Sequence, residues 1–184
     1  MALNVPTHGD GEPSDWVVRF APLIPPNGQV LDVACGKGRH ARYLSGRGYR
    51  VTALDRDPEA LRSIDSLPGG EVVCADIESG PWPFPSGNFD ALVVTNYLHR
   101  PLFPAIFGAL RSGGVLIYET FARGNEKHGR PANPDFLLAP GELLQRVPEG
   151  FVVAAFEQGT VFRPKPAVIQ RLCAIRIDTL LYKI

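Results

Sequence analysis

Apolar residues recur along the chain in short runs that alternate with amphipathic stretches. Runs rich in β-branched residues predict strands, and apolar spacings of three and four between them predict helices. The expected strands cover residues 30–34, 50–54, 71–75, 89–95 and 115–120. The expected helices cover residues 14–24, 38–46, a short segment opened by Asp57-Pro58, 101–110 and 140–147. Strands that alternate with helices indicate βαβ units and a mainly parallel sheet.

The C-terminal part has a different pattern. Two further strands are expected over residues 151–156 and 169–177, with no helical pattern between them. They most simply form an antiparallel pair at one end of the sheet. The predicted fold is therefore α/β: a doubly wound, mostly parallel seven-stranded sheet with an antiparallel C-terminal strand pair. Residues 1–12 are predicted to be a flexible arm, and residues 13–184 a single domain.

Composition narrows the class of protein. The 184 residues are 45% apolar and carry 19 basic and 19 acidic side chains, so the formal charge is 19 − 19 = 0, which disfavours a nucleic-acid-binding module. No apolar run approaches the length of about 18 residues that spans a membrane. The three cysteines, Cys35, Cys74 and Cys173, form no CxxC pair, so no disulfide framework or metal site is expected. Cys74 and Cys173 are expected in the core, and the chain is expected in the cytoplasm.

A glycine turn follows the first strand. Gly36 and Gly38 form G-x-G before a helix, and Asp55 closes the second strand 19 residues after Gly36. This arrangement suits a dinucleotide or S-adenosylmethionine, because each has a ribose that a carboxylate can bind. Asp32, four residues before Gly36, favours S-adenosylmethionine: its charge would oppose a pyrophosphate but attract an ammonium and a sulfonium. A structural role for Asp32, in a cap or an ion pair, is the alternative.

Four segments together resemble a known family. VLDVACGKGRHARYLSGRGYRVTALDRD is similar to the first motif and second strand of class I S-adenosylmethionine-dependent methyltransferases. VVCADIESGPWPF, FDALVVTNYLH and LRSGGVLIYET resemble the family's adenine region, fourth strand and fifth strand. The resemblance covers about residues 28–120 and implies a Rossmann-like methyltransferase fold. The small size is similar to that of the tellurite- and thiopurine-resistance methyltransferases.

The resemblance also implies roles for individual residues. Around the methionine part of the cofactor it places Asp32, the small Cys35 and the backbone of Ala34, Gly36 and Gly38. It places Asp55 on the ribose and three residues beside the adenine: Arg56, Asp76 and Ile77. It places Asn96 and Tyr97 at the end of the fourth strand, where they close the site. For Asp76, the alternative is a carboxylate that only starts a turn. The implied product is S-adenosylhomocysteine.

The fourth-strand motif bears on the acceptor. Asn96 begins Asn-Tyr-Leu-His, which differs from the Asn/Asp-Pro-Pro-Tyr/Phe motif of enzymes that methylate base or glutamine amides. If the acceptor is a hydroxyl or an amine, Tyr97 and His99 are the candidate general bases. A thiolate or chalcogen nucleophile would need no base. Oxygen, nitrogen, sulfur and heavier chalcogen acceptors all stay open, as does the oligomeric state.

Two long connections are expected on the ligand side of the sheet. Residues 121–139 and 157–168 leave the carboxyl ends of the fifth and sixth strands. Their charged or titratable side chains of interest are Arg123, Lys127, His128, Arg130, Arg163 and Lys165. We expect Arg123, His128, Arg130 and Arg163 to belong to a lid that attracts a small, anionic acceptor. Solvated loops whose charges only confer solubility are the alternative.

The favoured function is therefore methyl transfer from S-adenosylmethionine to a small-molecule acceptor, with no nucleic-acid or membrane partner. Two alternatives are an NAD(P)-binding oxidoreductase-like domain and a non-catalytic, regulatory protein that binds S-adenosylmethionine. The charge of Asp32 counts against the first alternative. Only binding without methyl transfer would favour the second.

Overall fold

The structure, a computed structural model, describes residues 11–177. Its strands are β1 (Gln29–Val33), β2 (Arg50–Asp55), β3 (Glu71–Cys74), β4 (Phe89–Thr95), β5 (Leu110–Phe121), β6 (Phe151–Val161) and β7 (Ala167–Arg176). Its α-helices are α1 (Asp15–Phe20), α2 (Arg39–Ser45), α3 (Pro58–Leu61), α4 (Phe103–Ala109) and α5 (Glu142–Gln145). The predicted flexible arm lies mostly outside the described residues.

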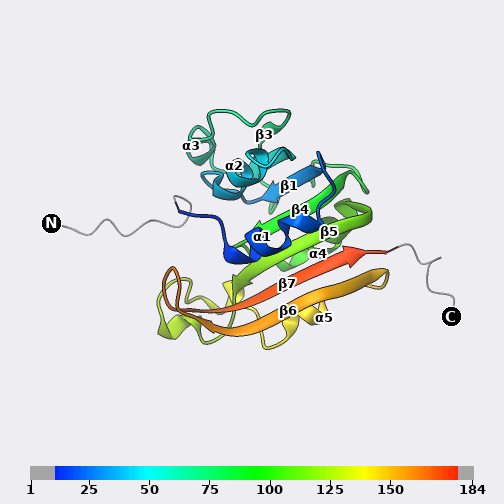
Figure 1. The fold of residues 1–184 in the computed structure, drawn as a ribbon. Helices are drawn as coiled ribbons and strands as arrows, with labels where there is room; N and C mark the ends of the chain where they lie inside the picture. Colours follow the sequence, from blue (N-terminus) through cyan, green and yellow to red (C-terminus); the bar gives the residue numbers. More distant parts are fainter. Residues whose placement is uncertain (1–10, 178–184) are drawn as a thin grey trace, which may run out of the picture.

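The seven strands form one sheet in the order β3-β2-β1-β4-β5-β7-β6 (Figure 1). Strands β1 to β5 pair in parallel, and β7 pairs antiparallel with both β5 and β6. The predicted α/β fold and its antiparallel C-terminal pair are confirmed. Because the strand order reverses between β1 and β4, the crevice at their carboxyl ends is where a ligand is expected.

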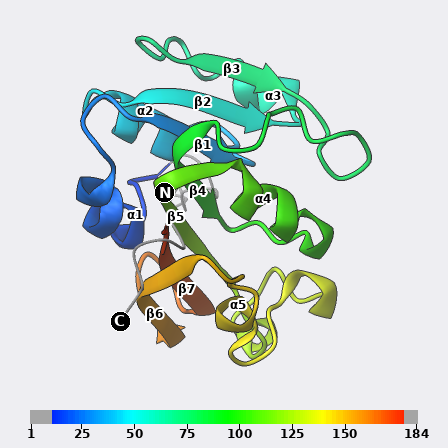
Figure 2. The ribbon, with the colours of Figure 1, turned by 90° about the vertical axis from the view of Figure 1, so that its right-hand side faces the viewer.

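Helices cover both faces of the sheet. Figure 2 shows α1 and α2 on one side of the sheet and α4 and α5 on the other. Alternate residues of β1 explain this arrangement: Val30 packs in the cluster under α1 and α2, whereas Leu31 and Val33 pack in the cluster under α4 and α5. Asp32 shares the α2 face with Val30. A carboxylate therefore stands within an otherwise apolar layer.

Three boundary predictions were wrong. Residues 157–161 and 167–168 belong to β6 and β7, so only residues 162–166 connect these strands. The polar side chains of this part of β6 are exposed on an edge strand, which is why they resembled a loop. The fifth strand begins at Leu110, before the glycines expected to precede it, and its ladder with β4 is interrupted by a bulge.

The 121–139 connection is also more ordered than expected. It contains the 3₁₀ turns Asn125–Lys127 and Pro134–Phe136, and Ala122 bridges Leu138. Leu138 is buried in the main core. Because the sequence predicts that residues 121–139 form part of a lid over the acceptor, we call this segment the acceptor loop.

Two of the cysteine predictions can be compared with the structure. Cys173 is buried, as expected, but Cys74 is exposed because β3 is the other edge of the sheet. Among the described helices, none combines the length and apolarity needed to cross a bilayer. Within the same residues, no group of three or more His, Cys, Asp or Glu side chains could hold a metal ion.

Candidate active site

The turn after β1 has two glycines with different roles. Gly36 and Gly38 have φ values of 55° and 77°, in the left-handed region that favours glycine. A Cβ on Gly38 would lie 2.6 Å from Cδ1 of Ile64, so this glycine allows the turn to pack closely on α3 and the residues after it. A Cβ on Gly36 would meet nothing within 4 Å. The backbone at Gly36 therefore borders open space into which a ligand can fit.

Asp55, at the end of β2, is held between two turns. Its Oδ2 accepts a hydrogen bond from the Gly36 amide at 2.7 Å, and its Oδ1 accepts one from the Asp57 amide at 2.9 Å. Both carboxylate oxygens keep further lone pairs, since each has room for a second donor. Asp55 is thus fixed at the crevice with free acceptor capacity.

Asp32 is the most unusual group near the turn. The residue is only 1% exposed, and neither carboxylate oxygen has a partner within hydrogen-bonding geometry among the described residues. Burial raises the pKa of Asp32 to about 7, although the Ala41 backbone and the Arg39 guanidinium act in the opposite direction. A buried, unpaired carboxylate costs stability. Asp32 is therefore suited to a hydrogen-bond donor or a cation supplied by a ligand.

The next charged residues line the cavity beside β2 and β3. Asp76 accepts hydrogen bonds from the Glu78 amide at 2.9 Å and from the Ser79 hydroxyl at 2.7 Å, and these bonds lower its pKa. Asp76 therefore does start a turn, yet it also lines the cavity with Ile77. Arg56 pairs with Glu78 at 3.5 Å. Glu78 is a lining residue that the sequence analysis missed.

The residues after β4 differ in their positions. Asn96 has a φ of 55° and lines the cavity together with Tyr97. The Tyr97 hydroxyl is buried and has no partner within hydrogen-bonding geometry among residues 11–177. Burial, and then the nearby Glu78, raises its pKa. Tyr97 therefore stays protonated at neutral pH and can donate a hydrogen bond, which does not favour the role of a general base. His99 is not a cavity-lining residue but precedes the 3₁₀ turn Arg100–Leu102.

The cavity itself has a volume of about 730 Å³, which is in the range of sites for small ligands. It is lined by Ala34, Leu54, Asp55, Arg56, Ala75, Asp76, Ile77, Glu78, Asn96, Tyr97, Leu98, Thr120, Phe121, Arg130, Pro131, Ala132, Asn133 and Phe136. These residues come from the carboxyl ends of β1 to β5 and from the acceptor loop. The cavity thus lies at the point where the strand order reverses.

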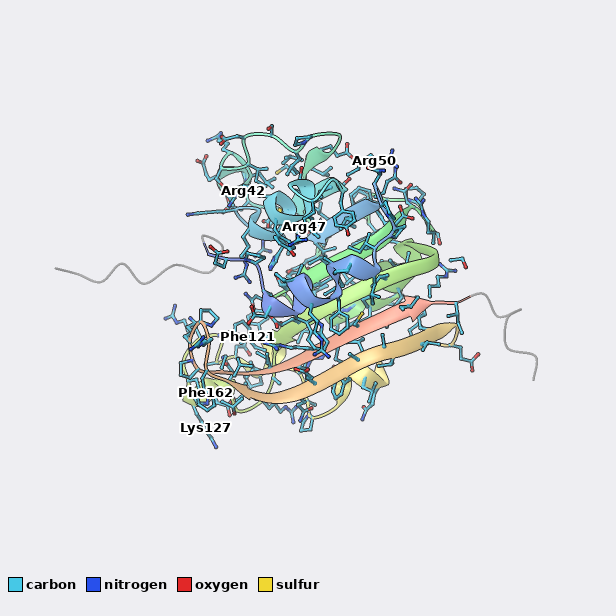
Figure 3. All side chains as sticks on the ribbon, viewed as in Figure 1. Arg42, Arg47, Arg50, Phe121, Lys127 and Phe162 are labelled. Atoms are coloured by element: carbon cyan, nitrogen blue, oxygen red, sulfur yellow. The ribbon has the colours of Figure 1, made fainter. Side chains whose placement is uncertain are left out.

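Only one of the four predicted lid residues reaches this cavity. Arg130 lines it, whereas Arg123, His128 and Arg163 are exposed elsewhere on the acceptor loop and the β6–β7 connection. Figure 3 shows Lys127 projecting outward at the lower left, whereas the buried Phe121 lies further in. Of the cationic cluster expected over the site, only Arg130 is among the residues that line the cavity.

Comparisons with known proteins agree with this geometry. A family model described as a methyltransferase domain matches residues 30–114. Trans-aconitate 2-methyltransferase of Paracidovorax citrulli (strain AAC00-1) is 38% identical over 96 residues, which are 47% of this chain and 36% of that protein. Malonyl-[acyl-carrier protein] O-methyltransferase of Serratia marcescens is 35% identical over 104 residues, 54% of this chain and 41% of that protein.

Residues 30–114 thus match a methyltransferase-domain model, and part of the chain is similar to two curated methyltransferases. The structure of TehB from Haemophilus influenzae has a TM-score of 0.71 at 21% identity, covering 88% of this chain and 61% of that one. At this identity the likeness shows the fold alone. The chain spans only 36% and 41% of the lengths of the two curated relatives, so their activities are not transferred to it directly.

The residues of this site fit S-adenosylmethionine. The unpartnered carboxylate of Asp32 suits a cation, and the open space at Gly36 suits a ligand that approaches the backbone closely. Asp55 offers free lone pairs to the hydroxyl groups of a ribose. A pyrophosphate at the same turn would face the charges of Asp32 and Asp55.

Predicted cofactor residues fall into two groups. Ala34, Asp55, Arg56, Asp76, Ile77 and Asn96 line the cavity. Asp32, Cys35, Gly36 and Gly38 are not among its lining residues and lie along the turn and the strand that support it. Burial strongly raises the pKa of the Cys35 thiol, which matches a small structural residue rather than a nucleophile.

His40 lies next to the end of β4, and its two hydrogen-bond partners were not predicted from the sequence. It is buried on α2, where its Nε2 accepts a hydrogen bond from the Ser14 amide at 3.1 Å and its Nδ1 lies 3.2 Å from the Thr95 hydroxyl. Burial lowers the pKa of His40 to about 3, so the ring is neutral. This neutral ring ties the start of α1 to the end of β4. No local pattern in the sequence could have indicated a partner 55 residues away.

Proposed function

We propose that this protein transfers a methyl group from S-adenosylmethionine to a small-molecule acceptor and releases S-adenosylhomocysteine. The observation that carries the proposal is Asp32, a buried carboxylate beside an open glycine turn that finds no hydrogen-bond partner in the described part of the chain. An ammonium or sulfonium near this position would supply the missing charge. The match of residues 30–114 to a methyltransferase-domain model supports the proposal, and the names of the two curated relatives support it further.

Each part of the chain has a task in this reaction. When bound, the cofactor supplies a methyl group on a positively charged sulfur. Asp32 would hold the charged end of the cofactor and Asp55 its ribose, at the crevice between β1 and β4. Leu98 and Phe121 provide an apolar wall that excludes water from the cavity. The chain thus contributes mainly orientation and desolvation, since the methyl group is already activated.

Whether the reaction needs a general base depends on the chemistry of the acceptor. The raised pKa of Tyr97 supports its use as a hydrogen-bond donor to a bound molecule rather than as a base. His99 lies just outside the residues that line the cavity. An acceptor that is already ionised needs neither residue. We therefore favour an anionic nucleophile over a neutral alcohol or amine.

The cellular location and the partners of the protein are part of the same proposal. We place the protein in the cytoplasm, with a small molecule and no nucleic acid or membrane as its partner. The unpaired cysteines and the balanced formal charge support this placement. The regulatory alternative is tested by the transfer of a labelled methyl group, and the NAD(P)-binding alternative by titration with NAD.

Methyl transfer is tested with S-adenosylmethionine that carries a labelled methyl group. The purified protein is incubated with it and with the small-molecule fraction of a deproteinised bacterial extract. The proposal predicts label in a small product and equivalent S-adenosylhomocysteine. Tight binding of S-adenosylmethionine with no labelled product would favour the non-catalytic alternative. An Asp55→Ala variant controls for transfer that does not use the cavity.

A further inference from the structure

The cavity has two chemically different ends. Asp55, Asp76 and Glu78 supply three carboxylates from the ends of β2 and β3, with Arg56 as their cation. The other end is formed by β5 and the acceptor loop. Its lining residues are Thr120, Phe121, Arg130, Pro131, Ala132, Asn133 and Phe136. The first end suits the adenosine of the cofactor, which leaves the second end for the acceptor.

The acceptor end is mainly apolar. Phe121 is buried, and Pro131 and Ala132 continue the same wall. Phe136 is 53% exposed even though it lines the cavity, so much of its ring has no protein partner. Large exposed aromatic rings at a cavity commonly bind apolar ligands. The body of the acceptor should therefore be aromatic or aliphatic.

Arg130 is the cation at this end. It lines the cavity, is exposed, and forms no ion pair with any residue between 11 and 177. A guanidinium presents a planar set of donors that matches the two oxygens of a carboxylate. A single guanidinium beside an apolar wall thus favours an acceptor with an apolar body and one carboxylate.

Buried polar contacts hold the acceptor loop in place. Asn125 is buried; its Nδ2 donates to the carbonyl oxygen of Pro131 at 3.0 Å, and its Oδ1 accepts from the Val168 amide at 3.2 Å. At the other end, Arg100 donates to the carbonyl oxygens of Asp135 at 2.7 Å and Leu137 at 3.0 Å. These contacts fix the segment between Arg130 and Phe136 on both sides.

Arg100 is itself held by a carboxylate. Its Nε and Nη2 donate to the two oxygens of Glu142 at 2.7 and 2.9 Å. This bidentate pair lowers the pKa of Glu142 to about 2. The cavity wall that carries Arg130 is therefore supported from α5 and from the core.

We infer that the acceptor is a carboxylate with an apolar body, which Arg130 binds through its carboxylate and Phe136 through its apolar part. The inference rests on the proposed function, because it assigns the remaining end of the cavity to the acceptor. It names Arg130 and Phe136 as the residues that select the acceptor. It also reduces the predicted lid to one residue that acts directly.

The test compares three probes with the same apolar body: 4-phenylbutyrate, 4-phenylbutan-1-ol and 4-phenylbutylamine. Each is titrated by calorimetry into the protein, with and without saturating S-adenosylhomocysteine. We expect the carboxylate to bind about tenfold more tightly than the alcohol, and the amine to bind most weakly. Equal affinity for the three probes, tighter binding of the amine, or no binding of the carboxylate would overturn the inference.

Matched variants assign the preference to one residue. Arg130→Gln should make the affinities for the carboxylate and the alcohol equal, whereas Arg123→Gln, on the same loop but outside the cavity, should preserve the difference. Phe136→Ala should weaken both probes by the same factor. A carboxylate preference that survives Arg130→Gln contradicts the inference. A chain that binds no S-adenosylhomocysteine but keeps an Arg130-dependent preference would refute the proposed function alone.

Discussion

Replacing Asp32 with asparagine should weaken cofactor binding and stabilise the free protein at the same time. The substitution keeps the size of the side chain and removes its charge. In the wild type the carboxylate is 1% exposed, has no hydrogen-bond partner within bonding geometry among residues 11–177, and has a pKa of about 7. Burial of a carboxylate in this condition costs stability, and the substitution removes the charge that causes most of this cost.

The magnitude for stability follows from the pKa of Asp32. The folded-state pKa of about 7 lies above the ordinary value of 3.8, so ionisation opposes folding. Stability from this group is complete below pH 3.8 and is lost as pH rises to about 7. The loss is at most about 4 kcal/mol at about 1.4 kcal/mol per pH unit. Asparagine keeps part of the burial cost, so Asp32→Asn should stabilise the free protein by roughly 1–3 kcal/mol at pH 8.

The magnitude for binding follows from the same group. The loss of a charge-assisted contact of about 1.5–3 kcal/mol corresponds to a roughly ten- to hundredfold weaker affinity. In the wild type, only the ionised carboxylate of Asp32 can bind the cofactor's cation. Affinity should therefore fall on the order of tenfold between pH 7 and pH 5.5. In Asp32→Asn this pH dependence should disappear.

Two assays check these expectations. Urea unfolding at pH 8 measures the free energy of unfolding of the wild type and of Asp32→Asn. Calorimetric titration with S-adenosylhomocysteine at pH 5.5, 6.25 and 7 measures affinity. A variant that is less stable than the wild type would support the alternative that Asp32 is a structural cap or ion-pair partner. Unchanged affinity with an unchanged pH dependence would refute the assignment of Asp32 to the cofactor.

Three further predictions concern stability and the turn. The pKa of His40 is lowered to about 3, so its protonation in the unfolded chain reduces the stability of the fold as pH falls below 6.5. In the wild type, protonation of Asp32 over the same range increases stability and opposes this loss. Asp32→Asn should therefore lose roughly 2 kcal/mol of unfolding free energy between pH 6.5 and 5, measured by urea unfolding. Glu142→Gln should destabilise the protein by roughly 2 kcal/mol at pH 7, because the depressed pKa of Glu142 provides stability that is lost as pH falls from 4.5 towards 2; a deficit that does not shrink below pH 4.5 would speak against this origin. Gly38→Ala should clearly lower the melting temperature because the added Cβ would meet Ile64, whereas Gly36→Ala should cost only about 1–2 kcal/mol of stability but abolish cofactor binding. A larger loss of stability in Gly36→Ala, with a larger loss of binding in Gly38→Ala, would contradict these roles.

Local patterns predicted the framework well. The strand β4 was expected over residues 89–95 and is found there, because its continuous apolar run suits a strand buried on both faces. The glycine turn and Asp55 were placed correctly because their spacing is fixed by one βαβ unit. The N-cap at Asp57 was also predicted, and its side chain accepts from the Glu59 amide at 2.9 Å.

The acceptor end could not be predicted in the same way. The position of the acceptor loop depends on Asn125 with Val168 and on Arg100 with Glu142, pairs separated by 43 and 42 residues. Contacts at such distances leave no periodic signal in the sequence. For this reason the expected cationic lid was too broad, and Phe136 was not among the candidate residues.

The edges of the sheet explain the remaining differences. Edge strands have one unpaired side and tolerate polar residues on both faces, so β6 was predicted too short and Cys74 was expected in the core. The position of an edge is a property of the whole sheet. A pattern of neighbouring residues describes a strand's own character but not whether a second strand lies beside it.

Binding of the cofactor to the cavity is the central claim, and one calorimetric comparison tests it most directly. S-adenosylmethionine, S-adenosylhomocysteine and NAD are titrated separately into the protein at pH 7, and into Asp55→Ala as a control. We predict binding of the first two at one site, strong weakening of both in Asp55→Ala, and no binding of NAD. Binding of NAD without binding of S-adenosylmethionine would contradict the account.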